Sequence, residues 1–376
     1  MDFSAQDHLF MAQALRKAQG GRYLSTPNPF VGCVLVRDGV LIGEGHTQVA
    51  GGDHAEIQAL HDCRRRGNDP RGATAYVTLE PCAHYGRTPP CALRLVEAGV
   101  VRVVAAISDP FPEVAGRGLA LLREAGITAE VGLMAGEARA LHHGFLSRVE
   151  RGRPWVVAKI GASLDGRTAL ASGESKWITG EAARADVQHL RARACAIITG
   201  VQTVLADDPL LTVRRLDGEP WTLVRQPLRV VLDSRLRTPP TVQMLKAPGK
   251  TLFVWSGENT DELNARQAAL EAEGAETLWL GGADGRVDLP GLLNKLAERG
   301  INTALVEAGG RLNGAFLMAG LVDELVLYQA PVLLGGSARS LAEFHLERLA
   351  DRPHALETER VAVGEDLRWT LRYTPY

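Results

Sequence analysis

Runs of apolar residues alternate with helical periodicities from the start of the chain to residue 146. Met11, Ala14 and Ala18 lie on one face of a predicted helix, and Asp38-Gly39 joins two apolar runs in a predicted hairpin. Further helices are predicted near 54–63, 91–98 and 119–125, and strands at 75–79, 100–107 and 128–131. Two strands followed by repeated helix–strand alternation predict an α/β fold with a mixed sheet covered by helices.

A polar, arginine-rich stretch ending in Pro154 interrupts this pattern. We expect a linker at 147–154 between a first domain at 1–146 and a second at 155–376. Beyond it, strands are predicted at 155–160, 196–199, 228–232, 251–255, 303–306 and 324–328, and helices at 181–194 and 262–272. This renewed alternation predicts a second α/β domain.

Composition narrows the classes of partner. The 376 residues include 42 Lys plus Arg and 44 Asp plus Glu, a formal net charge of -2. This balance gives no global reason for a nucleic-acid partner and favours small substrates. The five cysteines are too few and odd in number for a disulfide framework, and Cys33, Cys63 and Cys195 are expected in the core. The N-terminal segment does not have the pattern of a signal peptide, and no apolar run approaches the roughly 18 residues of a membrane span. We therefore expect a cytoplasmic protein without a membrane partner.

One histidine and two cysteines stand where they could bind a metal. His54 and Cys91 each begin a predicted helix, and Cys82 follows a strand end. One imidazole and two thiolates suit Zn²⁺, and three protein ligands leave a position for water, as in catalytic zinc sites. Glu56 would then carry a proton from the water to a leaving nitrogen. Zinc nucleobase deaminases carry H-x-E followed by P-C-x-x-C, whereas here residues 83–90 separate the cysteines.

Each of these residues also has a plainer interpretation. Asp53 and Glu56 could form only a capping box at a helix start, and His54 could be an ordinary histidine. Cys82 and Cys91 could be inert buried thiols. The hypothesis of a metal site depends on the occurrence of all these residues together in the sequence. We expect His84, in the loop between the cysteines, to contact substrate or backbone, because the metal already has three protein ligands.

The loop between the cysteines carries the most specific signal in the chain. Residues 80–91, E-P-C-A-H-Y-G-R-T-P-P-C, closely resemble the bifunctional deaminase–reductase family of riboflavin biosynthesis. Other segments resemble the same family in order: T-P-N-P-F-V-G-C-V at 26–34, D-P-F-P-E-V-A-G-R-G at 109–118, K-I-G-A-S-L-D-G-R-T-A at 159–169, G-E-S-K-W-I-T at 173–179, T-V-L-A-D-D-P-L-L-T-V-R at 203–214 and V-E-A-G-G at 306–310. The resemblance spans essentially the whole chain.

The resemblance implies two successive reactions on a small phosphorylated pyrimidine. The first domain, similar to cytidine deaminases, would use zinc to deaminate 2,5-diamino-6-(5-phosphoribosylamino)pyrimidin-4-one. The second, similar to dihydrofolate reductase, would use NADPH to reduce the ribosyl group to ribityl. The choice of NADPH over NADH rests on the resemblance alone.

Matching positions imply the residues of the second site. Cofactor contacts would come from Gly161, Trp177, Thr203, Asp207, Ser234, Gly309, Gly310, Arg311, Leu312, Asn313, Gly314 and Ala315. Substrate contacts would come from Ser175, Arg191, Leu211, Arg214 and Glu307. Arg191 and Arg214 suit a phosphate, because a guanidinium pairs bidentately with its oxygens. Lys159, Asp207 and Glu307 are unranked candidates for supplying a proton or polarising the ribose.

Two positions depart from the family pattern, and two other functions compete. The family commonly has histidine two positions after Gly45, where this chain has His46-Thr47, and this leaves a substrate contact from that loop open. The His142-His143 segment likewise has histidine where an asparagine is common. A nucleic-acid editing deaminase would need basic grooves with stacking aromatics, yet aromatics are only 5% of the chain. A structural zinc protein would not need Glu56. We expect a homo-oligomeric enzyme without a nucleic-acid partner.

Overall fold

The chain folds into two compact units, each with its own hydrophobic core. The computed structural model describes residues 3–83, 89–111, 114–214, 225–282 and 285–376. The first unit comprises residues 1–152 with Tyr376, and the second comprises residues 153–375. None of the helices in these described ranges has both the length and the apolar character that a membrane crossing requires. Cys33, Cys63 and Cys195 are buried, as expected of core residues.

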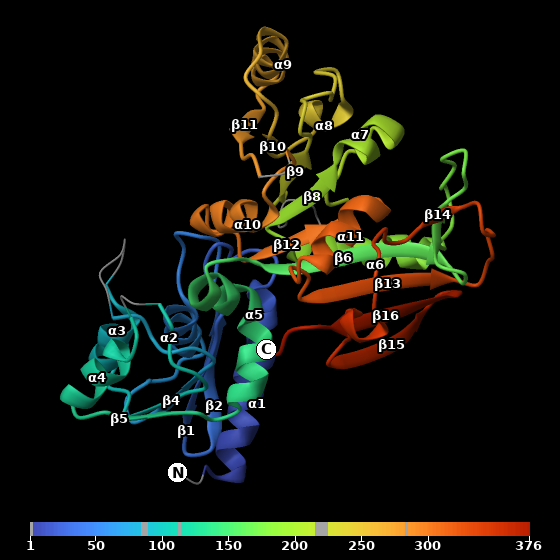
Figure 1. Cartoon of the computed structure of the whole chain (residues 1–376). Helices are drawn as coiled ribbons and strands as arrows, with labels where there is room; N and C mark the ends of the chain where they lie inside the picture. Colours follow the sequence, from blue (N-terminus) through green and yellow to red (C-terminus); the bar gives the residue numbers. More distant parts are fainter. Residues whose placement is uncertain (1–2, 84–88, 112–113, 215–224, 283–284) are drawn as a thin grey trace. The chain divides into compact units, whose positions relative to one another are not determined.

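The first unit is built on a five-stranded sheet in the order β2-β1-β3-β4-β5 (Figure 1). Its strands are β1 (Gly32–Arg37), β2 (Val40–His46), β3 (Thr74–Val77), β4 (Arg102–Ala105) and β5 (Thr128–Val131). Strand β1 runs antiparallel to both neighbours, whereas β3, β4 and β5 are parallel. The expected mixed sheet is therefore confirmed.

Helices cover both faces of this sheet. They are α1 (Ala5–Ala18), α2 (Ala55–Arg65), α3 (Cys91–Glu97), α4 (Arg117–Glu124) and α5 (Ala135–Arg151), with a 3₁₀ turn η1 (Gln19–Gly21) after α1. A Cβ on Gly45 would lie 2.4 Å from the Ala55 carbonyl oxygen, so α2 packs directly on β2. A Cβ on Gly32 would lie 2.0 Å from the Ala14 oxygen of α1. Because Gly45 pairs with Cys33, the residue after Gly32, α1 and α2 lie on opposite faces.

Helix α5 extends into the stretch that the sequence analysis assigned to a linker. Residues 147–151, expected to be linker, form the last turns of α5. The buried face of α5 has helical spacing and consists of Ala138, Leu141, His142 and Phe145. The polar residues around them obscured this periodicity in the sequence. Gly152 then ends the helix in a left-handed conformation.

The second unit contains a nine-stranded sheet in the order β11-β10-β9-β8-β12-β6-β13-β16-β15. Its strands are β6 (Trp155–Ser163), β8 (Ala196–Gly200), β9 (Leu228–Leu232), β10 (Thr251–Trp255), β11 (Glu276–Trp279), β12 (Thr303–Val306), β13 (Glu324–Ala330), β15 (Glu357–Val363) and β16 (Asp366–Arg372). Only β16 pairs antiparallel, with β13 and β15. A separate pair joins β7 (Arg167–Ala169) to β14 (Arg339–Ser340).

The second unit's helices alternate with the parallel strands. They are α6 (Glu181–Arg193), α7 (Val201–Asp207), α8 (Gln243–Lys246), α9 (Asp261–Ala272), α10 (Leu289–Glu298) and α11 (Gly310–Met318), with a 3₁₀ turn η3 (Leu349–Asp351). Val306 of β12 pairs with Ala158 of β6. This register brings Glu307, the residue after β12, beside Lys159 on β6.

Candidate active sites

A cluster of one histidine and two cysteines lies at the start of two helices in the first unit. His54 is the N-cap of α2, Cys91 is the first residue of α3, and Cys82 lies beyond β3. Their ligand atoms all lie within 4.8 Å of one another, and His54 Nδ1 is 3.7 Å from Cys82 Sγ and 3.4 Å from Cys91 Sγ. A tetrahedral zinc ion with ordinary bond lengths would separate such N and S atoms by about 3.6 Å. The donor set therefore fits zinc in both chemistry and spacing.

The pKa values of the two cysteines in this cluster also fit a metal site. A hydrogen bond from the Cys91 side chain, together with His54, lowers the pKa of Cys82 to about 4. The same hydrogen bond and burial raise the pKa of Cys91 well above its ordinary value. The backbone N–H of Cys91 also donates to Cys82 Sγ at 3.3 Å. Thiolate character at Cys82 is thus stabilised at the start of α3, where the helix dipole favours negative charge.

Glu56 lies in the first turn of α2 beside these ligands. Only 3% of the residue is exposed, and its carboxyl hydrogen-bonds with the Cys91 side chain. Burial raises the pKa of Glu56 to about 7, against an opposing effect of His54. A carboxyl that exchanges its proton near neutral pH suits general acid–base work. The capping-box alternative is wrong, because α2 has no side-chain cap hydrogen bond and Asp53 instead accepts one from Gln58 Nε2.

The two departures from the family pattern are accommodated in the interior. Thr47 is buried, and its Oγ1 accepts the Val31 N–H at 3.0 Å, so its side chain is used within the fold. His142 on α5 is also buried, and its Nε2 lies 3.3 Å from Thr78 Oγ1. His84 lies outside the described residues.

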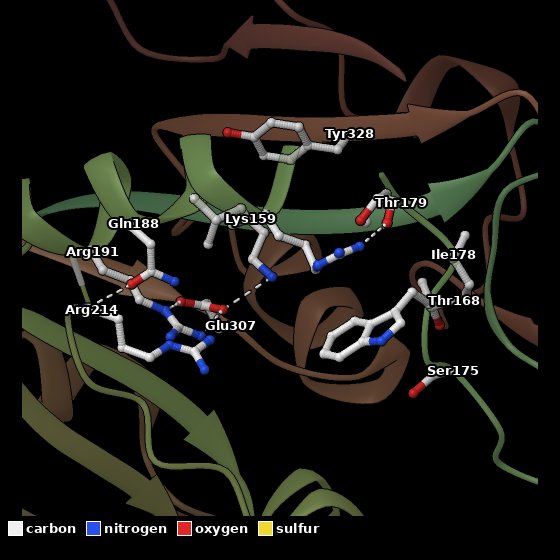
Figure 2. A pocket seen from close by; sticks show the side chains of 14 residues that line it. Lys159, Thr168, Ser175, Ile178, Thr179, Gln188, Arg191, Arg214, Glu307 and Tyr328 are labelled. Carbon is white, nitrogen blue, oxygen red and sulfur yellow. Dashed lines mark hydrogen bonds and ion pairs between the residues drawn. The ribbon is translucent and has the colours of Figure 1, made fainter. Parts of the chain in front are cut away.

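A cavity of about 230 Å³ lies in the second unit. Seven of the predicted site residues line it: Lys159, Gly161, Ser175, Trp177, Arg191, Arg214 and Glu307. Figure 2 shows Lys159 and Arg191 turned toward the Glu307 carboxylate, with Arg214 beside them. The pocket thus gathers side chains that are far apart in the sequence.

Glu307 is the centre of this pocket's charge. Its Oε2 lies 3.0 Å from Lys159 Nζ, and Arg191 binds both oxygens through Nε at 2.6 Å and Nη2 at 3.0 Å. Burial raises the pKa of Glu307, but the two cations outweigh it and hold the pKa well below its ordinary value. The carboxylate is therefore ionised and balances one of the two cations.

The two arginines expected to bind phosphate differ in how far their guanidinium groups are already held by other groups of the protein. Arg191 is fixed by Glu307 and by a bond from Nη1 to the Thr212 carbonyl at 3.1 Å. Arg214 is exposed, and among the described residues the contact that fixes it is made by its backbone N–H, which donates to Gln188 Oε1 at 2.9 Å. The guanidinium of Arg214 is therefore the freer anion ligand.

Other predicted residues of the second unit do not line this cavity. They are Thr203, Asp207, Leu211, Ser234 and residues 309–315. Asp207 ends α7, and the Leu211 side chain is buried, so Leu211 would reach a ligand through its backbone. Cβ atoms on Gly310 and Gly314 would lie 2.5 Å from the Ser340 oxygen and 2.1 Å from the Glu343 oxygen.

These glycines therefore let α11 pack closely, a role that the sequence analysis did not foresee. Gly309, by contrast, faces open space at the N-cap of α11, where backbone N–H groups suit a phosphate. The Asn313 side chain is fully buried and donates to the carbonyls of Ala308 and Leu341. Asn313 thus holds the turn together from inside.

Comparison with known proteins identifies the family. The model of the RibD C-terminal domain matches residues 154–358, and that of the cytidine and deoxycytidylate deaminase zinc-binding region matches residues 4–107. The riboflavin biosynthesis protein RibD of Escherichia coli K12 is 50% identical over 96% of this chain and 98% of its own. The chain belongs to the RibD family.

Solved structures of the RibD family agree over the whole chain. Acinetobacter baumannii RibD superposes with a TM-score of 0.89 at 45% identity, covering 98% of this chain and 99% of that one. A Thermotoga maritima protein described as a diaminohydroxyphosphoribosylaminopyrimidine deaminase/5-amino-6-(5-phosphoribosylamino)uracil reductase gives 0.84 at 30% identity, with the same coverage. The two expected fold types are confirmed.

Several residues that line the second pocket of this RibD-family chain were not predicted from its sequence. Arg184, Gln188 and Tyr328 are the polar ones with the clearest contacts. Arg184 lies over the Trp177 ring at 4.6 Å from its centroid and donates to the Thr179 carbonyl. Helical spacing was the available signal, because 184, 188 and 191 recur on one face of α6.

Proposed function

We propose that this chain is a bifunctional enzyme of riboflavin biosynthesis, with a zinc deaminase in the first unit and an NADPH-dependent reductase in the second. It removes an amine from 2,5-diamino-6-(5-phosphoribosylamino)pyrimidin-4-one and then reduces the ribosyl group to ribityl. Family membership over the full chain is the observation that carries this proposal. The His54, Cys82 and Cys91 cluster and the charged pocket each support one half of it.

In the deaminase, His54, Cys82 and Cys91 would hold zinc. The metal supplies an activated water at neutral pH. Glu56, buried beside Cys91, would take the proton of that water and deliver it to the departing ammonia. Because Glu56 is shielded from solvent, its proton passes to the substrate rather than to bulk water.

In the reductase, the pocket's excess of cations would hold the substrate phosphate. Arg214 is the freest guanidinium, while Arg191 is fixed by Glu307. NADPH supplies the hydride. Lys159, held by Glu307 in the pocket, is placed to donate a proton to the ribose, and we favour it over Asp207, which does not line the cavity. Gly161, Trp177, Thr203, Ser234 and residues 309–315 remain the proposed cofactor contacts, and Ser175 and Leu211 the further substrate contacts.

A single incubation tests both halves. Zinc-loaded protein is mixed with the diaminopyrimidinone ribosyl phosphate, and ammonia release is followed before NADPH is added. We expect ammonia first and NADPH oxidation only afterwards. Ammonia without later NADPH oxidation would contradict the reductase assignment, and no ammonia from zinc-loaded protein would contradict the deaminase substrate. The cytoplasmic location, the homo-oligomeric state and the lack of a nucleic-acid partner stay predictions.

A further inference from the structure

Glu80 is a buried carboxylate whose hydrogen-bond partners among the described residues are backbone N–H groups. It is 3% exposed and lies two residues before Cys82. Its Oε2 accepts from Asp109 N and Gly116 N, each at 3.1 Å. Its Oε1 accepts from Gly118 N at 2.9 Å and Leu119 N at 3.2 Å. Three of the four donors lie at the start of α4 and the fourth, Asp109 N, lies after β4, so this carboxylate binds the chain before Cys82 to both segments.

The backbone on either side of Cys82 is fixed by further contacts. Glu80 N donates to the Ile107 carbonyl at 3.0 Å, and Ala92 N donates to the Cys82 carbonyl at 3.2 Å. A Cβ on Gly118 would lie 1.9 Å from the Pro81 oxygen, so α4 begins in direct contact with the peptide before Cys82. The sulfur of Cys82 is therefore held between α4, through Glu80 and Pro81, and α3.

We propose that Glu80 is a positioning residue that holds Cys82 in the geometry required for metal binding. The inference rests on the proposed zinc deaminase function. If the thiolate is already in place before the ion binds, no free energy is spent on ordering the chain during binding. Loss of groups that orient a metal ligand lowers metal affinity about 10–100-fold. Glu80 thus acts on the metal through Cys82 and does not touch substrate.

The deciding variant is Glu80→Gln. Glutamine has nearly the same shape, but an amide NH₂ replaces one carboxylate oxygen and meets two backbone N–H donors. We expect its zinc dissociation constant, measured by competition with a chromophoric chelator, to rise about tenfold or more. We also expect the thiolate-to-metal absorption of the Co²⁺-substituted protein to change. Reduction of supplied deaminated substrate by the second unit should stay at the wild-type rate.

Asp7→Asn is the matched control. Asp7 is equally buried in the same unit and accepts hydrogen bonds from Tyr76 Oη at 2.7 Å and Arg102 Nη1 at 2.6 Å. This variant should be less stable but bind zinc like the wild type. The proposal would be overturned if Glu80→Gln bound zinc as tightly as the wild type. It would also be overturned if Glu80→Gln and Asp7→Asn lost zinc affinity to the same extent. If Glu80→Gln does not fold, Glu80→Asp, which withdraws the carboxylate by one methylene, is judged by the same criteria. Failure of the wild type itself to bind zinc would instead contradict the proposed function.

Discussion

Glu307, the residue after β12, and Lys159 on the neighbouring parallel strand β6 form an ion pair of 3.0 Å in the reductase pocket. The same carboxylate also holds Arg191, so one anion faces two cations at the centre of the cavity. Arg184 and Arg214 add two more positive charges to the lining. A pocket with this excess of cations suits a phosphorylated substrate and a phosphorylated cofactor.

Glu307→Gln should disable the reductase. Removing the carboxylate leaves Lys159 and Arg191 without their counter-charge, and breaking a buried ion pair costs about 3–5 kcal/mol. We expect kcat/KM for the reduction to fall about 10²–10⁴-fold, since each tenfold corresponds to about 1.4 kcal/mol. Stopped-flow NADPH oxidation with the deaminated substrate measures this change, while ammonia release should persist.

Asp323→Asn separates this effect from general destabilisation. Asp323 is fully buried in the same unit, binds Arg153 and the Val156 N–H, and does not line the pocket. Its variant should unfold more easily but keep its kcat/KM at low temperature. A comparable loss of kcat/KM in both variants would contradict a specific role of Glu307.

Arg214→Gln should raise the KM of the reduction with little change in kcat. The exposed guanidinium is free to bind phosphate, and a charge-assisted hydrogen bond contributes about 1.5–3 kcal/mol, so the rise should be about 10–100-fold. The increase should shrink at high ionic strength. Arg348→Gln is the control, because Arg348 is exposed and pairs with Asp351 away from the pocket. An unchanged KM would assign the phosphate to other cations.

The sequence predicted most of the first site, because its chemistry lies in short motifs. His54 and Glu56 share one helix turn, and Cys82 and Cys91 flank one loop, so local structure places the members of each pair together. The two pairs meet through tertiary packing, which the combined motif indicated. The capping-box alternative could be rejected only with coordinates, since Asp53 and Glu56 have the same spacing in either case.

The reductase site was harder to predict in physical terms. Lys159, Arg191 and Glu307 meet only because β6, β12 and α6 pack together, and no local pattern encodes that packing. Gly310 and Gly314 are also required by the close packing of α11, which the sequence did not reveal. Residues 147–151 of the expected linker form the end of α5, whose buried face was hidden in the sequence by polar residues.

Glu56→Gln should slow deamination strongly while leaving the metal in place. General acid–base groups contribute about 10²–10⁴-fold, so ammonia release should slow by that factor. Zinc content, measured by atomic absorption, should match the wild type, and NADPH oxidation with supplied deaminated substrate should be unaffected. Removal of zinc by a chelator should likewise stop ammonia release alone. Full deamination by the variant would contradict the acid–base role assigned to Glu56.

His142 should make the first unit less stable as the pH falls. Burial lowers the pKa of His142 to about 3, and its Nδ1 has no hydrogen-bond partner among the described residues. An unfolded histidine protonates near pH 6.5, so between about 6.5 and 3 the unfolded state binds the extra proton. Stability from the neutral folded ring is thus complete above pH 6.5 and is lost on acidification.

The loss should reach about 1.4 kcal/mol per pH unit in that window. Hydrogen exchange of α5 amides between pH 7.5 and 5 measures it, after correction for intrinsic exchange rates. His142→Gln should flatten the dependence, because glutamine does not titrate. His61→Gln, at a histidine whose side chain is 53% exposed, should leave it unchanged. An equally steep profile in His142→Gln would assign the acid sensitivity to other groups, such as the Asp7 carboxyl. Hydrogen bonds from Arg102 and Tyr76 outweigh the effect of burial and hold the pKa of Asp7 well below its ordinary value.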